Sequence, residues 1–146
     1  MILLGTRNTT TQDLGVGDLI NFGEVYRRYD KRGNCGCRAF EVNGTSIALQ
    51  QSGIYHLTAV ITFTAPAAGD VEFQLAENGF LIPGAITTET VTTATTESNT
   101  TVIDFYILVD SSFVLNAVNT LKSISIANTG VASTVTNVVV NIDKVV

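Results

Sequence analysis

The stretch GIYHLTAVITFTA, residues 53–65, decides the fold of this chain. It contains no Asp, Glu, Lys or Arg, and its apolar residues recur with the period of two that indicates a β-strand. One face of this strand is suited to a core and carries Tyr55, Leu57, Ala59, Ile61 and Phe63. The opposite face carries Ile54, His56, Thr58, Val60, Thr62 and Thr64. Because this second face is neither plainly apolar nor charged like a solvent face, we expect another surface to cover it.

The composition suits one domain whose surfaces pack against copies of themselves. The chain has 146 residues, of which 45% are hydrophobic and only 14% charged, against a usual charged share of about a quarter. No apolar run approaches the roughly 18 residues of a membrane span. The run from Ile2 to Leu4 is too short for a signal peptide. We therefore expect no membrane partner and no export signal.

Charge is distributed unevenly along the chain. Residues 1–38 carry a net charge of +2 and residues 39–146 a net charge of −7. The acidic larger part argues against nucleic-acid binding. The basic N-terminal part could instead dock onto an acidic partner, although a solvated loop is the alternative interpretation. The candidate docking residues are Arg27, Arg28, Lys31 and Arg32.

Short runs of β-branched and aromatic residues, separated by turn residues, predict an all-β antiparallel sandwich or barrel. No stretch of real length has the period and caps of a helix. The strands are expected at residues 19–26, 38–42, 45–50, 54–65, 70–77, 85–93, 100–109, 121–127 and 134–145. Turn residues lie between many of them, including Asn-Gly at 43–44 and PAAG at 66–69.

Three segments resemble the tumour-necrosis-factor-like and complement-globular-head-like jelly rolls. QQSGIYHLTAVITFTA resembles their central strand, and VEFQLAENGFLIPGA the hairpin that follows it. The segment from TTVIDFYILV to the terminal VVVNIDKV is similar to the bacterial and phage branch. That branch includes C-terminal domains of spore-surface collagen-like glycoproteins and phage head-fibre or decoration proteins. The resemblance implies a jelly-roll β-sandwich assembled as a homotrimer. We expect residues 46–146 to form the trimerisation domain, and residues 1–45 the first strands and a docking segment.

Two further strands have a second face that is too apolar to leave in water. Residues 100–109 place Val102, Asp104, Tyr106 and Leu108 opposite their core face. The last strand places Val135, Asn137, Val139 and Asn141 opposite its core face. A sheet buried against symmetry mates has this character. The predicted trimer interface consists of His56, Thr58, Val60, Thr62, Asp104, Tyr106, Leu108 and Val139.

Candidate chemistry is sparse. His56 is the one histidine, and copies near a threefold axis could bind a metal or act as a pH switch, but an ordinary interface histidine is favoured. Cys35 and Cys37 lack the C-x-x-C spacing and further ligands of a zinc site. Glu89, Glu97 and Asp104 are interpreted as solvated rather than as a catalytic pair. With no nucleophile–base arrangement or catalytic motif, we expect no enzyme, cofactor or bound metal.

The segment DSSFVLNAVN, residues 110–119, is a candidate binding loop because it places Phe113, Val114 and Leu115 in a predicted connection. The alternative is that these apolar side chains pack under the loop. The leading functional hypothesis is a trimeric capsid decoration or head-fibre protein of a virion, assembled in the host cytoplasm. The alternatives are a surface adhesion module that binds a host glycan or protein, and a structural protein of a spore or cell surface.

Overall fold

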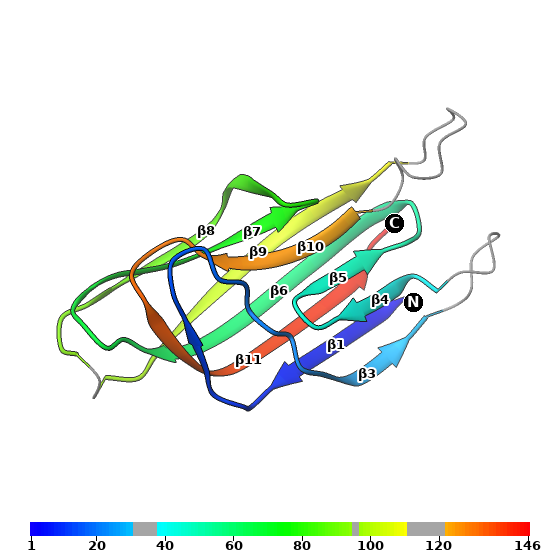
Figure 1. The fold of residues 1–146 in the computed structure, drawn as a ribbon. Coiled ribbons are helices and arrows are strands. Elements are labelled where there is room, and N and C mark those ends of the chain that lie inside the picture. Colours follow the sequence, from blue (N-terminus) through cyan, green and yellow to red (C-terminus); the bar gives the residue numbers. More distant parts are fainter. Residues whose placement is uncertain (31–37, 95–96, 111–121) are drawn as a thin grey trace.

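The chain folds as a sandwich of two antiparallel sheets (Figure 1). The computed structural model describes residues 1–30, 38–94, 97–110 and 122–146. Within these ranges all regular structure is β-strand. No helix in the described part of the chain has the length and apolar character needed to cross a bilayer. The all-β antiparallel sandwich predicted from the sequence is confirmed.

Sheet A has six strands and contains the alternating stretch at residues 53–65. Its path runs β3-β1-β11-β6-β9, and the short β2 pairs with β11 beside β1. Its strands are β1 (Leu3–Asn8), β2 (Gln12–Leu14), β3 (Glu24–Tyr29), β6 (Gly53–Thr64), β9 (Asn99–Val109) and β11 (Ser133–Lys144). β6 therefore lies inside the sheet and is paired along its length by β11 and β9.

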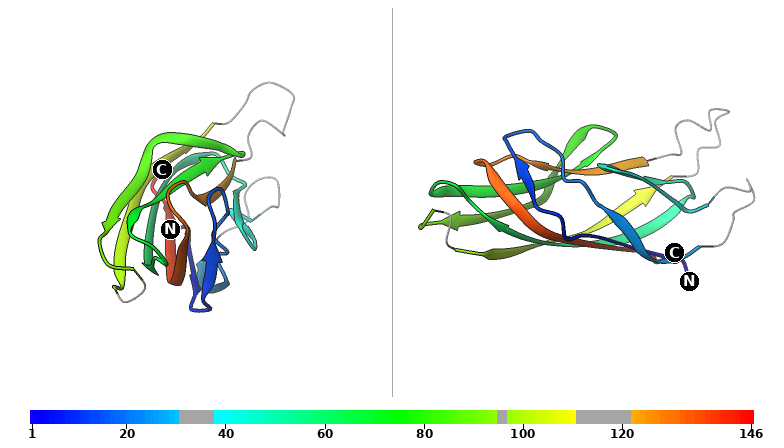
Figure 2. Two further views of the ribbon diagram at one scale, coloured as in Figure 1. Left: turned by 60° about the vertical axis from the view of Figure 1, so that its left-hand side comes forward. Right: turned by 60° about the horizontal axis from the view of Figure 1, so that its bottom comes forward.

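Sheet B has five strands in the order β4-β5-β10-β7-β8 and forms the second layer (Figure 2). Its strands are β4 (Phe40–Asn43), β5 (Ser46–Leu49), β7 (Gly69–Glu77), β8 (Phe80–Val91) and β10 (Lys122–Asn128). At one side of the sandwich the edge strands β8 and β9 are in contact, and the hydroxyls of Thr87 and Thr101 form a hydrogen bond there. At the other side the edge strands β3 and β4 do not pair. The sandwich is thus joined along one side. On the other side, which we call the open side, residues 17–22 bridge to β10 and to the turn between β4 and β5, but β3 and β4 themselves stay apart.

The core lies between the sheets and follows the alternation of β6. Tyr55, Leu57, Ala59, Ile61 and Phe63 are fully buried, as the sequence predicted. Aromatic pairs join the two layers. The rings of Phe63 and Phe73 meet edge to face with centroids 5.7 Å apart, and those of Phe40 and Tyr55 do the same at 5.7 Å. Such pairs stabilise a core beyond the area they bury.

The N-terminal segment is part of this core. β1 lies between β3 and β11, and the side chains of Leu4, Ile20 and Phe22 are completely buried. The expected boundary at residue 45 falls in the tight turn between β4 and β5, which pair with each other. It does not mark a structural division, because residues on both sides share one core.

The prediction of a strand at residues 19–26 is wrong for the first half of that range. Leu19 makes only an isolated bridge to Ala127, and the regular strand β3 begins at Glu24. Gly23 explains the break. Its φ is +76°, and a Cβ there would lie 2.3 Å from the carbonyl oxygen of Arg7. Only glycine allows this close approach in the left-handed region.

A second departure concerns the outward face expected for the last strand. Val135 was placed there, but it is completely buried. The pairing of β11 with β6 shifts register between Val135 and Asn137, so that Val135 pairs with the core residue Phe63. A β-bulge changes which side of the sheet the next residues face. The remaining residues expected on the core side, Val138, Val140 and Ile142, are buried as predicted.

We predict that Leu4→Ser destabilises the protein by about 3 kcal/mol or more, because it leaves a cavity and buries a hydroxyl. Leu3→Ser is the matched control on the same strand: Leu3 pairs with Asp143 on the outward side of sheet A and is only half-buried. It should cost about 1 kcal/mol or less. Urea unfolding followed by circular dichroism measures both. Equal, small effects would mean that β1 is not an integral strand.

Tyr55 carries the one polar atom among the large core side chains of β6. Its hydroxyl donates to the backbone oxygen of Gln51 at 2.7 Å. Burial raises the pKa of this phenol from 10.0 to about 12. The folded protein therefore holds this proton more tightly than the unfolded chain does. The stability contributed by the neutral phenol is complete below pH 10 and is lost as the pH rises through about 12.

We accordingly predict that Tyr55 makes the free energy of unfolding fall between pH 10 and 12 by up to about 1.4 kcal/mol per pH unit. The comparison is between urea unfolding of the native protein and of Tyr55→Phe, at a series of pH values. Tyr55→Phe should lack this component of the slope. Identical slopes in the two proteins would show that Tyr55 ionises equally easily in the folded and unfolded states.

Candidate functional site: the outward face of sheet A

The register of sheet A brings the predicted interface residues together on one surface. His56 pairs with Tyr106, Thr58 with Asp104 and Val60 with Val102 across β6 and β9. On the other side of β6, Val139 pairs with Val60. We call this surface the sheet A face. It consists of Ile54, His56, Thr58, Val60, Thr62, Val102, Asp104, Tyr106, Leu108, Val139, Asn141 and Asp143.

The apolar members of the sheet A face that lie on β9 are well exposed. Val102 is 48% exposed, Tyr106 60% and Leu108 51%. They alternate with core residues such as Ile103 and Ile107. β9 is also an edge strand, where a row of exposed apolar side chains beside unpaired backbone groups favours association. The face can therefore bury a substantial apolar area against another surface.

A polar cluster around His56 crosses this face. The imidazole stacks on the ring of Tyr106, with centroids 4.7 Å apart and 19° between the planes. Its Nε2 donates to Oδ1 of Asp104 at 2.5 Å, and its Nδ1 lies 3.6 Å from Oδ1 of Asp143. Side chains of β6, β9 and β11 thus hold one another in place. A fixed arrangement loses less side-chain entropy when a second surface covers it.

Tyr26 covers the end of the face nearest β3. Its hydroxyl donates to Oδ1 of Asn141 at 2.7 Å. Its ring lies directly over Gly5, where a Cβ would approach ring carbon atoms to 2.8 Å. The guanidinium groups of Arg7 and Arg27 lie 5.5 and 5.8 Å from the ring centroid. Gly5 is therefore required by the close approach of an aromatic ring rather than by its backbone angles.

The predicted docking residues are only partly described. Arg27 and Arg28 lie on β3. Lys31 and Arg32 lie outside the described residues, as do Cys35 and Cys37 and the candidate binding loop with Phe113, Val114 and Leu115.

The carboxylates considered for catalysis are not brought together: Glu89 lies on β8 of sheet B, and Asp104 faces outward on β9 of sheet A. In the described ranges no group of three or more His, Cys, Asp or Glu side chains could hold a metal ion.

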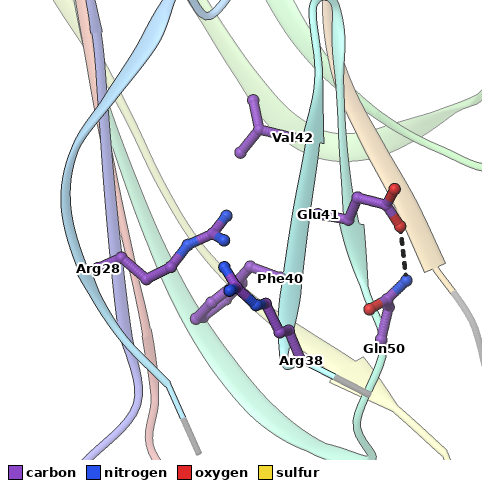
Figure 3. A pocket seen from close by; sticks show the side chains of 6 residues that line it. All are labelled: Arg28, Arg38, Phe40, Glu41, Val42 and Gln50. Atoms are coloured by element: carbon purple, nitrogen blue, oxygen red, sulfur yellow. Dashed lines mark hydrogen bonds between the residues drawn. The ribbon is translucent and has the colours of Figure 1, made fainter. Parts of the chain in front are cut away.

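One feature was missed by the sequence analysis. Arg28 and Arg38 line a pocket of about 390 Å³ at the open side of the sandwich, together with Phe40, Glu41, Val42 and Gln50 (Figure 3). Arg28 lies on β3 of sheet A and Arg38 just before β4 of sheet B, ten positions apart in the sequence. No local pattern links them, because only the approach of β3 to β4 makes them neighbours.

Comparison with known proteins identifies the fold. The globular domain of zebrafish complement 1qA superposes with a TM-score of 0.61 at 7% identity, covering 100% of this chain and 98% of that one. Murine APRIL superposes with a TM-score of 0.58 at 11% identity, covering 97% of this chain and 98% of that one. The PRD1 vertex protein P5 superposes with a TM-score of 0.56 at 12% identity, covering 100% of this chain and 74% of that one.

No protein-family model matches the sequence, and neither does any curated protein. The chain thus has the jelly-roll fold of the complement globular heads and tumour-necrosis-factor-like proteins, which a phage vertex protein shares. The fold predicted from the resemblance is confirmed.

We predict that Gly5→Ala destabilises the protein by about 1 to 3 kcal/mol, because the added methyl group overpacks against the ring of Tyr26. In the background of Tyr26→Ala the same substitution should cost much less, since the ring is gone. Thermal unfolding of the two single variants and the double variant gives the coupling energy. Additive effects would show that Tyr26 does not lie over Gly5 in solution.

Proposed function

We propose that the chain is a non-enzymatic structural protein of a virion, a trimeric capsid decoration or head-fibre protein. Three copies associate through the sheet A face, and the N-terminal segment helps to dock the trimer onto the particle. The described residues offer no nucleophile–base pair, and the one histidine is held between two carboxylates. The protein would act by occupying a position on a particle rather than by chemistry.

The exposed apolar row on β9 is the observation that carries this proposal. Covering Tyr106 and Leu108 in an interface would contribute on the order of 3 kcal/mol per chain, at roughly 25 cal/mol per Å² of apolar area. Val60, Val102 and Val139 extend the row across β6 to β11. An apolar centre with few charges is the usual composition of an obligate interface between identical subunits.

Threefold order is supported by the resemblance rather than by the face itself. The fold is that of the complement globular heads and tumour-necrosis-factor-like proteins, for which the resemblance implies trimers. A closed ring of this kind requires that one surface of each subunit contact a different surface of the next. The joined side of the sandwich, where β8 and β9 meet, is beside the sheet A face and available for that second contact.

The virion assignment is supported by the similarity to a vertex protein of PRD1 over the whole of this chain. Docking is assigned to the N-terminal segment because it carries most of the cationic side chains in an otherwise acidic protein. Genes for capsid and portal proteins beside the gene of this chain would support the assignment, and their absence would count against it.

A second candidate function is a surface module that binds a host glycan or protein. The pocket that contains Arg28 and Arg38 favours it, because two unpaired cations meet there across the open side of the sandwich (Figure 3). The two functions are compatible, since the pocket is lined by residues of β3, β4 and Gln50, whereas the sheet A face is centred on β6 and β9.

We predict that the native protein has a mass in solution of three times 15.5 kDa, and that Tyr106→Asp and Leu108→Asp each reduce it to 15.5 kDa. A carboxylate at either position would be buried without a partner in the trimer, at a cost of several kcal/mol. Light scattering coupled to size exclusion measures the mass.

Val16→Asp is the matched control, because Val16 is a 72% exposed apolar residue in the connection between β2 and β3, away from β8 and β9. It should leave the mass unchanged. A native protein that is monomeric at micromolar concentration would contradict the proposal. So would a mass that Tyr106→Asp and Leu108→Asp leave unaltered.

A further inference from the structure

The open side of the sandwich holds a pocket whose main feature is a pair of guanidinium groups. Arg28 reaches it from β3, the edge of sheet A, and Arg38 from the residues just before β4, the edge of sheet B. In Figure 3 the two groups point toward one another above Phe40. Neither forms an ion pair or a side-chain hydrogen bond within the described part of the chain. Two like charges that converge without a counter-charge favour an anion between them.

A β-bulge turns Arg28 into this position. β1 and β3 pair Gly5 with Arg27 but Thr6 with Val25, so Tyr26 is the extra residue. After the bulge, Arg28 pairs with Leu4, whose side chain is in the core. Arg28 therefore faces inward, between the sheets, whereas Arg27 faces outward. Bulges commonly redirect a side chain in this way next to functional sites.

The burial of Arg28 makes its lack of a partner costly. Its Nε is buried and has no hydrogen-bond partner in the described residues. A buried donor without a partner costs about 1–3 kcal/mol, and more when it is charged. Asp30, just after the end of β3, does not pair with it, and Oδ2 of Asp30 is itself without a partner in the described residues. A ligand carboxylate could bind the two terminal nitrogens of the guanidinium in two-point geometry.

The rest of the pocket suits a small molecule with a ring. The floor is the buried ring of Phe40, which is fixed by its edge-to-face contact with Tyr55. Glu41 and Gln50 point to the other side of β4 from the two guanidinium groups (Figure 3), and there Nε2 of Gln50 donates to Oε2 of Glu41 at 2.9 Å. The volume of about 390 Å³ lies within the usual range for small-molecule pockets.

We propose that this pocket binds an acidic sugar through its carboxylate. Arg28 and Arg38 hold the carboxylate, and the sugar ring packs over Phe40. The net charge of −5 opposes an extended polyanion such as an acidic peptide. A single carboxylate on a small ring matches the two cations and the aromatic floor.

The test is calorimetric titration of the full chain with glucuronate and with N-acetylneuraminate, and with glucose and N-acetylglucosamine as neutral controls. Saturable binding of at least one acidic sugar is expected, with no binding of the neutral sugars. Arg28→Gln and Arg38→Gln should each weaken binding by about tenfold or more. Arg28→Lys should also weaken it, because the ammonium cannot make the two-point contact.

Arg27→Gln is the matched control: it removes the same charge from the adjacent position of β3, beside Tyr26 and outside the pocket. It should leave the affinity unchanged, and thermal unfolding confirms that each variant is folded. The proposal is overturned if no acidic sugar binds, or if Arg27→Gln weakens binding as much as Arg28→Gln does. It is also overturned if acetate or a glutamate-rich peptide binds as tightly as the sugars. None of these results bears on the mass of the assembly, so this proposal and the proposed function fail separately.

Discussion

Pairing of β6 on both sides is the constraint on which the rest of the structure depends. This strand is hydrogen-bonded to β11 and β9 over nearly all of its length, and its inward side chains are completely buried. A strand inside a sheet has no freedom to slip, because a shift of one residue would move its whole apolar set out of the core. The register of β6 therefore fixes that of its neighbours. It also fixes which residues of three strands share the outward face.

The two sides of the sandwich divide the functional surfaces between them. Contact between β8 and β9 joins the sheets on one side, and the sheet A face lies next to that join. On the other side β3 and β4 stay apart, so inward-facing polar groups such as those of Arg28 can remain near the surface. An inward-facing position can hold an arginine only where the sheets separate, because burying an unpaired charge completely would cost too much free energy. The open side is thus a place where a polar pocket between the layers is possible.

Much of the architecture could be predicted from the sequence because strong alternation is a local signal. The two faces of residues 53–64, the strand at 100–109 and the hairpin with its Asn-Gly turn all follow from patterns a few residues long. The sequence did not predict β1, because Gly5 and Thr6 weaken its apolar pattern. In the structure Gly5 makes room for the ring of Tyr26, and Thr6 is buried in the core. Val135 and Arg28 were misplaced or overlooked for a shared reason. Each lies beside a β-bulge, and a bulge depends on the partner strand rather than on the sequence around it.

The two proposals strengthen one another through valency. A single pocket with one charge-paired carboxylate contact would bind a sugar only weakly, since much of the contact energy is offset by the loss of ligand freedom. A trimer built on the sheet A face would carry three copies of the Arg28–Arg38 pocket in fixed relative positions. On a surface that displays many acidic sugars, the second and third contacts would then form at high effective concentration, and avidity could exceed the single-site affinity by about 10²-fold or more. A trimer mounted on a particle would multiply this effect again. A weak pocket at the open side of a jelly roll is therefore sufficient for attachment only because the opposite part of the same fold favours assembly.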